Sequence, residues 1–246
     1  MAPPNKLVLS NGMELMRVPA GEFLIGSKAN NQLAYDDEKS QQGVDIPYDY
    51  WMARCPVTNE LYNAYVKVKA IKHPLDGWGN KKDHPVVNVS WKDAVEYCRW
   101  LNDLLKGELP SGLVLRLPTE AEGEKAARGV DGREYPWGNE FDKNKCNTRE
   151  GGKGNTTSVG LYSPRGDSPY GCADMAGNVW EWTHSLSKKY PYNASDGRED
   201  EKASGNRVLR GGSFGCDDRY ARCAYRNGGS DFLFIDFGFR VVASPA

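Results

Sequence analysis

Side chains suited to chemistry are concentrated in the C-terminal half, and the first group lies in DMAGNVWEW at 174–182. Acids at 174 and 181, a glycine at 177 and the backbone at 179 can wrap oxygen atoms around a hard cation. Calcium takes six to eight such oxygens from carboxylates and backbone carbonyls. The alternative is that Asp174 and Glu181 cap turns while Trp180 and Trp182 fill the core.

A second group is the apolar run FLFIDF at 232–237, which directly precedes GFRVV at 238–242. Alternation along a strand turns only one face to the core, so some of these large side chains should be exposed. Exposed aromatic residues beside short acids give an adaptable binding surface at low conformational cost. The alternative is that 232–237 is a buried strand. Asp231 and Asp236 count against full burial, because an unpaired buried carboxylate is costly.

The six cysteines stand singly, without a CxxC pair, and the three histidines show no ligand spacing. Zinc binding is therefore disfavoured. In a domain of this size without an evident signal peptide, we expect reduced thiols.

Charge and hydropathy exclude several classes of partner. Lys plus Arg number 32 and Asp plus Glu 33, so the net charge of -1 gives no overall field for nucleic acid or an anionic membrane. The start of the chain resembles no signal peptide, and no apolar run reaches 18 residues. We therefore expect a cytoplasmic protein with no nucleic-acid or membrane partner.

Three helices and several short strands are predicted. Ser90 caps a helix through about Leu105, Thr119 forms a capping box with Glu122 before Gly129, and Thr58 begins a shorter helix. The expected strands are 13–18, 22–25, 46–53, 207–210 and 237–242. The polar segment 184–206 is expected to be a solvated loop, and no internal repeat is present.

Eight motifs occur in one order along nearly the whole chain. They are VPAGEFLIGS at 18–27, CPVTNELYNAYV at 55–66, HPVVNVSWKDAVEYCRWLN at 84–102, LRLPTEAEGEKAARG at 115–129, YPWGN at 135–139, YGCADMAGNVWEWT at 170–183, RVLRGGSF at 207–214 and GFRVV at 238–242. Together they resemble the formylglycine-generating enzyme (sulfatase-modifying factor) family. The resemblance implies one domain over 1–246 with an α+β, C-type-lectin-like fold of small antiparallel sheets and two or three helices. In EAEGEKA, Gly123 replaces the family's usual tryptophan.

For metals, the resemblance implies that calcium would be held by the Asp174 and Glu181 carboxylates and the Gly177 and Val179 carbonyls. A second family calcium site would use Asn147 and the carbonyl of Thr148, but its acidic partner is not evident in GGKGN.

The family's enzymes oxidise a substrate cysteine with two thiols that bind copper after GGS. Cys216 matches the first thiol, but Ala221 stands at the second. Copper binding is therefore not expected, and a copper-dependent oxidase that uses Cys216 is the alternative function.

A second branch of the family comprises the variable proteins of diversity-generating retroelements, which place a hypervariable ligand-binding surface in the C-terminal segment. Their framework is matched by RVLRGGS at 207–213, RCAYRN at 222–227 and GFRVV at 238–242. In those systems adenines are randomised, which cannot produce Lys, Glu, Gln, Met or Trp from an asparagine codon. None of these five residues occurs in FGCDDRY at 214–220 or GGSDFLFIDF at 228–237.

The resemblance thus implies a non-catalytic binding protein with a variable region at 207–242 and a protein ligand of unknown identity. The predicted ligand contacts are Phe214, Gly215, Cys216, Asp217, Asp218, Tyr220, Tyr225, Ser230, Asp231, Phe232, Leu233, Phe234 and Asp236.

Overall fold

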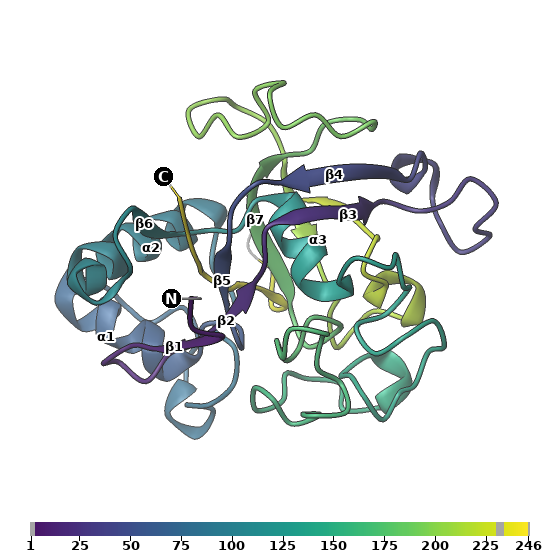
Figure 1. Cartoon of the computed structure of the whole chain (residues 1–246). Helices are drawn as coiled ribbons and strands as arrows, with labels where there is room; N and C mark the ends of the chain where they lie inside the picture. The colour runs from purple at the N-terminus through teal and green to yellow at the C-terminus, as the bar shows by residue number, and fades with distance from the viewer. Residues whose placement is uncertain (1–2, 230–233, 246) are drawn as a thin grey trace.

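The computed structural model describes residues 3–229 and 234–245, and its longest sheet runs through the middle of the molecule (Figure 1). This sheet has the strand order β1 (Lys6–Val8), β2 (Glu14–Val18), β5 (Tyr50–Ala53), β11 (Val242–Pro245) and β6 (Leu113–Arg116). All of its neighbouring strands are antiparallel. The C-terminal strand β11 is therefore interior, with β5 on one side and β6 on the other.

A second sheet carries the C-terminal segment. Its order is β10 (Phe237–Phe239), β7 (Trp180–Leu186), β8 (Arg207–Arg210) and β9 (Asn227–Gly229), and β10 runs parallel to β7. A separate hairpin pairs β3 (Gly21–Ile25) with β4 (Gln42–Ile46). This arrangement of small, mostly antiparallel sheets agrees with the expected α+β fold.

Two predicted strands are split in the structure. The stretch 237–242 divides into β10 and the start of β11, which belong to different sheets and are separated by the buried Arg240 and Val241. The stretch 46–53 divides into the last residue of β4 and the whole of β5.

All three predicted helices are confirmed, with their caps. They are α1 (Asn59–Lys69) after Thr58, α2 (Trp91–Leu105) after Ser90, and α3 (Glu120–Arg128) after Thr119. The Thr119 hydroxyl accepts from the Glu122 amide at 3.1 Å, and the Glu122 carboxylate accepts from the Thr119 amide at 2.8 Å. Short 3-10 turns occupy Asp36–Glu38, Trp78–Asn80, Lys106–Glu108, Arg149–Gly151 and Asp218–Ala221. Among the described residues, no helix has the length and apolar character needed to cross a bilayer.

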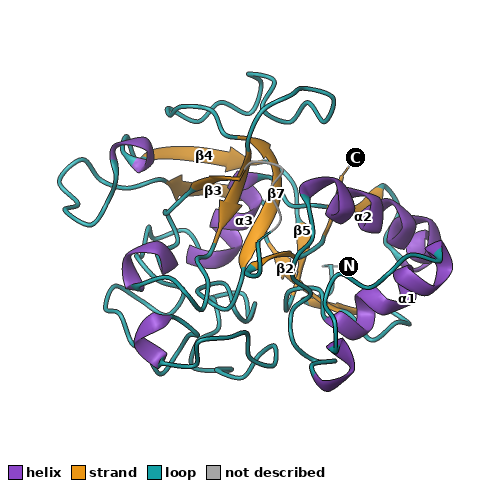
Figure 2. Cartoon of the chain, turned by 180° about the vertical axis from the view of Figure 1, so that it is seen from behind, coloured by secondary structure: helices purple, strands orange, loops and turns teal. Residues whose placement is uncertain are grey.

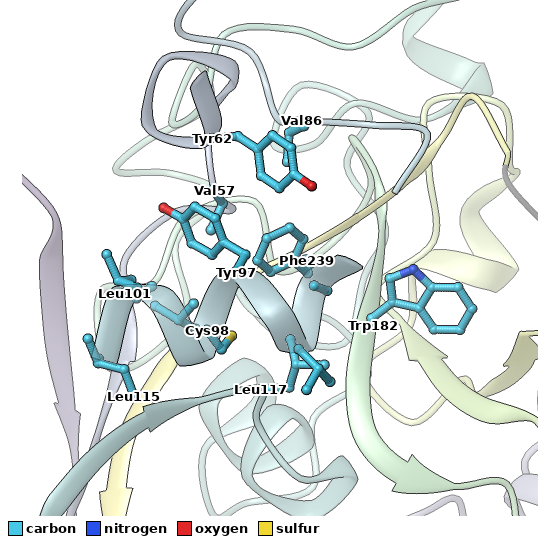
Figure 3. Packing of buried hydrophobic residues seen from close by; sticks show 14 of the residues in the cluster. Val57, Tyr62, Val86, Tyr97, Cys98, Leu101, Leu115, Leu117, Trp182 and Phe239 are labelled. Carbon is cyan, nitrogen blue, oxygen red and sulfur yellow. The ribbon is translucent and has the colours of Figure 1, made fainter. Parts of the chain in front are cut away.

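The main core lies between the central strands and the pair α1 and α2, which cover one side of the molecule (Figure 2). Tyr62 and Tyr97 stack with their ring centroids 5.4 Å apart, and Phe239 meets Tyr97 edge-on at 5.3 Å. Figure 3 shows these rings against Trp182 and the leucines of the helix and strand. Phe239 belongs to GFRVV at 238–242, just after the stretch 228–237, so a framework side chain of the candidate variable region 207–242 belongs to the core.

Helix α3 lies on the other side of the central strands, next to β7 and the β3–β4 hairpin (Figure 1). All nine of its residues are buried, including its charged ones. Glu120 accepts from Arg210 at 2.7 Å and from both Nε and Nη2 of Arg226, at 2.7 and 2.8 Å. Glu124 pairs with Arg128 one turn later, at 2.7 Å. Buried charges persist in proteins when they are paired in this way.

The prediction that 184–206 is a solvated loop is only partly right. Residues 184–186 belong to β7, and the Arg198 side chain farther along is fully buried. The Arg198 guanidinium lies 4.1 Å from the Tyr192 ring and 3.5 Å from Glu120. The segment was misread because a charged sequence is usually solvated, whereas here its arginine is neutralised inside.

Gly123 lies in the middle of α3 beside a cavity of about 20 Å³, which is walled in part by Met175, Trp182 and Cys223. A Cβ built there meets no atom within 4 Å. Since alanine is favoured over glycine inside a helix by about 1 kcal/mol, we expect Gly123→Ala to raise the free energy of unfolding by about 0.5–1 kcal/mol. Urea denaturation would measure the change. A loss of stability would show that the cavity is needed as it is.

Candidate recognition surface

The segment 214–220 leaves β8 through Gly211 and Gly212 and returns as a 3-10 turn. Gly212 has a φ of 72°, and a Cβ there would lie 2.9 Å from the Tyr220 carbonyl oxygen, so this turn requires glycine. Backbone contacts hold the segment, because the Phe214 amide donates to Asn178 and the Arg149 amide donates to the Cys216 carbonyl. Gly215 is exposed, and the predicted contacts Phe214, Cys216, Asp217, Asp218 and Tyr220 are all half-buried.

Aromatic rings form one part of the surface. Tyr220 and Tyr225 meet edge-on with centroids 4.8 Å apart, and Trp180 lies 5.6 Å behind Tyr225. Tyr35 contacts both tyrosines, at 6.4 and 5.7 Å. The three tyrosine rings are partly accessible and Trp180 is buried beside them, which suits the tyrosines to contact a partner with little loss of rotamer freedom.

Tyr35 comes from the connection between β3 and β4, which the sequence did not assign to the site. The Arg219 guanidinium lies 3.8 Å above the Tyr35 ring, and its Nε donates to the Leu33 carbonyl at 2.6 Å. Deeper down, Arg222 donates to Glu38 at 2.7 Å. The connection is thus tied to the candidate variable segment at two levels. No local signal announces these contacts, because more than 180 residues separate the partners.

An apolar hollow forms another part of the surface. Phe214 and Ile235 line a hollow of about 230 Å³ together with Leu75, Val87 and Lys81. Ile235 is 69% exposed and Phe234 47% exposed, whereas Phe237 is buried against Trp182. The outward position of Phe234 agrees with the prediction, and Ile235 is a surface residue that the prediction missed. The predicted contacts Ser230, Asp231, Phe232 and Leu233 lie outside the described residues.

Asp236 is a predicted ligand contact whose observed contacts are internal. Its carboxylate accepts from the Ser213 hydroxyl at 2.7 Å, and its carbonyl accepts from the Trp180 amide at 2.8 Å. It therefore ties the end of the variable segment to the framework, and the carboxylate that seemed too costly to bury has a donor.

The thiols do not form the pair that copper oxidation requires. The Cys216 sulfur lies 3.3 Å from the Ser213 hydroxyl and packs against the α1–α2 core. Cys223 lies in a different cluster with Cys172 and Met175, and burial raises the pKa of its thiol to about 12. Ala221 is buried at the position of the second family thiol. All six cysteines are free.

Three of the four residues predicted to bind calcium have internal partners for the oxygens concerned. The Glu181 carboxylate accepts from Nε and Nη2 of Arg240 at 2.5 and 2.6 Å, and Asp174 accepts from the Gly160 amide at 2.6 Å. The Gly177 carbonyl accepts from the Val179 amide. Burial raises the pKa of Asp174 to about 6.

The second implied calcium site offers few additional oxygen ligands. The buried Oδ1 of Asn147 has no hydrogen-bond donor among the described residues. One open amide oxygen falls well short of the six to eight oxygens that calcium needs. Three or more His, Cys, Asp or Glu side chains nowhere gather into a metal-binding group in the described part of the chain. As arranged, these residues do not fit a calcium ion, because Arg240 neutralises the Glu181 carboxylate.

Comparison with known proteins identifies the fold and the family together. The sulfatase-modifying factor enzyme 1-like domain matches residues 4–245. The chain belongs to this family. A formylglycine-generating enzyme from Thermomonospora curvata is 36% identical over 201 residues, which cover 72% of this chain and 61% of that protein. The inactive C-alpha-formylglycine-generating enzyme 2 of Bos taurus is 38% identical over 187 residues, covering 69% and 54%.

Membership of this family does not by itself establish catalytic activity, because the relatives include both enzymes and a protein named as inactive. This chain also spans only 54–61% of the length of the two relatives above. The structure of Treponema denticola variable protein 1 superposes with a TM-score of 0.79 at 23% identity, over 99% of this chain and 100% of that one. That likeness establishes a shared C-type-lectin-like fold.

Proposed function

We propose that this chain is a non-catalytic recognition protein that binds a protein partner through residues 214–225 and 234–235. The carrying observation is that Phe234 and Ile235 project outward, while the framework on either side of them is fixed by Phe237, Phe239 and buried arginines. Stability and recognition thus depend on different side chains, so the outward ones can vary without loss of the fold.

The thiol geometry supports a binding role over oxidation. Soft thiolates hold Cu(I) in pairs, and Cys216 has Ala221 where a family enzyme has its second thiol. Cys223 is packed in the core with a raised thiol pKa, so the reactive thiolate is disfavoured there. A copper-dependent oxidase remains the alternative that experiment must test.

The chemistry of the surface favours a protein as partner. The tyrosine rings and the apolar hollow offer contact area, and Arg219, Asp217 and Asp218 surround the rings with charges of both signs. Interfaces between proteins are enriched in such aromatic residues and in arginine, with a polar rim. The chain's balanced charge gives no comparable support for nucleic acid.

The triple substitution Phe214→Ala, Phe234→Ala and Ile235→Ala is expected to change the free energy of unfolding by less than about 1.5 kcal/mol, because accessible side chains contribute little to folding. The matched control Phe239→Ala removes a fully buried ring and is expected to cost about 3–5 kcal/mol. Guanidinium denaturation would compare the two. If the triple variant lost as much as the control, the outward side chains would belong to the core.

A display library can test recognition directly. Positions 214, 217, 218, 220, 234 and 235 would be randomised and the displayed chains selected against hen egg-white lysozyme as the probe. Folded binders are expected, and reverting their randomised positions should abolish binding. In parallel, the natural chain loaded with Cu(I) would be incubated with a cysteine-containing peptide. Aldehyde formation on that peptide, or the absence of any folded binder, would overturn the proposal.

A further inference from the structure

A polar cleft of about 470 Å³ lies between the segments 143–153 and 161–165. Its walls carry three cationic side chains, Lys143, Lys153 and Arg165, together with the half-buried Tyr162 and the exposed apolar Leu161. The cleft is distinct from the recognition surface but adjoins it. Glu150 in its wall accepts from the Asp218 amide at 3.2 Å, and the neighbouring Arg149 donates to the Gly215 carbonyl.

These three cations are not closely paired in the described parts of the chain, although the Asp142 carboxylate attracts Arg165 from beyond ion-pair distance. None of them forms an ion pair or a side-chain hydrogen bond there, although the protein as a whole has slightly more acids than bases. Glu150 is the one carboxylate of the wall. The nearby Asp142 carboxylate accepts a hydrogen bond from the Asn144 backbone amide at 2.9 Å, and the Lys145 ammonium lies 4.0 Å from it.

Cations gathered around a concave surface focus the field and attract anions. A guanidinium donates two parallel hydrogen bonds to an oxyanion, and ammonium groups act as additional point charges. The hydroxyl of Tyr162 can donate as well. The arrangement therefore favours an anion with several oxygens and more than one negative charge.

We propose that this cleft binds a phosphorylated small molecule, with the phosphate monoester held by Lys143, Lys153 and Arg165. The hollow is larger than one phosphate group, so the attached part of the molecule, of about the size of a sugar ring, would lie over Leu161 and Tyr162. This site does not depend on the proposed recognition function, and either can be correct without the other.

Calorimetric titration at low salt would use glucose 6-phosphate, inorganic phosphate, inorganic sulfate and glucose as probes. We expect glucose 6-phosphate to bind more tightly than free phosphate or sulfate, and glucose not to bind. The variant Lys143→Ala, Lys153→Ala, Arg165→Ala should bind glucose 6-phosphate at least about tenfold more weakly, which corresponds to about 1.4 kcal/mol. Raising the salt concentration should weaken binding to the natural chain.

The matched control is Lys67→Ala, Lys92→Ala, Lys106→Ala, which removes the same charge from exposed positions on α1 and α2 and just beyond. It should bind as the natural chain does, and thermal unfolding would verify that both triple variants fold. An equal loss of affinity in the control would show that the effect is only a general attraction between charges. Equal affinity for sulfate and glucose 6-phosphate would show that any oxyanion is accepted. Either result, or no binding of any probe, would overturn the proposal.

Discussion

Replacing Glu120 with glutamine is expected to lower the free energy of unfolding by about 3–5 kcal/mol, which is the usual cost of removing one partner of a buried ion pair. Glu120 is fully buried, and its carboxylate is shared by Arg210, Arg226 and Arg198. Without its charge, Arg226 would lose its carboxylate partner, and Arg210 and Arg198 would keep only Glu124 and Asp196. Chemical denaturation of the natural chain and of Glu120→Gln would measure the loss.

The same carboxylate gives the protein a dependence on pH. Burial alone would raise the pKa of Glu120, but Arg210, Arg226 and Arg198 outweigh burial and hold the pKa below its usual value. This contribution to stability is therefore fully present above about pH 4.3, the ordinary value for glutamate, and is lost as the pH falls through the lower folded value. In Glu120→Gln, the free energy of unfolding should therefore fall less steeply at acid pH than in the natural chain. The control Glu60→Gln, on the exposed face of α1, should change neither the stability nor its dependence on acid pH by a measurable amount. A loss below about 1 kcal/mol for Glu120→Gln would contradict the assignment.

Replacing Arg222 with methionine is expected to cost a similar amount, about 3–5 kcal/mol, and also to free the connection that carries Tyr35. Arg222 and Glu38 are both fully buried and 2.7 Å apart, and Arg222 also approaches Glu134 at 3.6 Å. The substitution would strand the Glu38 carboxylate, which also accepts from the Tyr35 amide at 3.0 Å. Limited proteolysis within 28–40 should therefore be faster in the variant, in addition to the loss measured by denaturation.

A double substitution separates the charge effect from simple packing. Glu38→Gln combined with Arg222→Met removes both charges, and we expect it to recover part of the stability lost in Arg222→Met alone, since no buried charge is left unpaired. If the double variant lost more stability than the two single variants lost together, packing around the guanidinium would be the larger contribution. Unchanged proteolysis in Arg222→Met would show that other contacts hold the Tyr35 connection.

Helices and the overall fold could be predicted because their signals are local. Ser90, Thr119 and Thr58 cap helices through contacts within three residues, and such contacts can be read directly from the sequence. The ordered motifs fixed the family, and with it the C-type-lectin-like fold. The position of β7 was missed because the WEW motif was interpreted as ligands and core residues, although its alternating tryptophans also fit a strand.

The candidate site was only partly predictable, because its remaining features come from long-range contacts. Tyr35 reaches Tyr220 across the fold, and nothing in the polar sequence around Tyr35 indicates this. Asp236 was expected to face solvent, since the sequence could not show that Ser213 donates to it. The buried arginines were equally hidden, because a charged residue is normally read as exposed.

The interior position of β11 determines which altered forms of this chain could still fold. Its last strand pairs with β5 on one side and β6 on the other, and it follows the candidate variable segment in the sequence. A stop codon or a shift of reading frame within codons 214–237 would therefore delete β10 and β11, which would detach β6 from the central sheet and leave β5 paired only with β2. Such products would fail to fold and be degraded, whereas single amino-acid exchanges at the surface would pass. Completion of the sheet would thus require that translation has crossed residues 214–237 in frame.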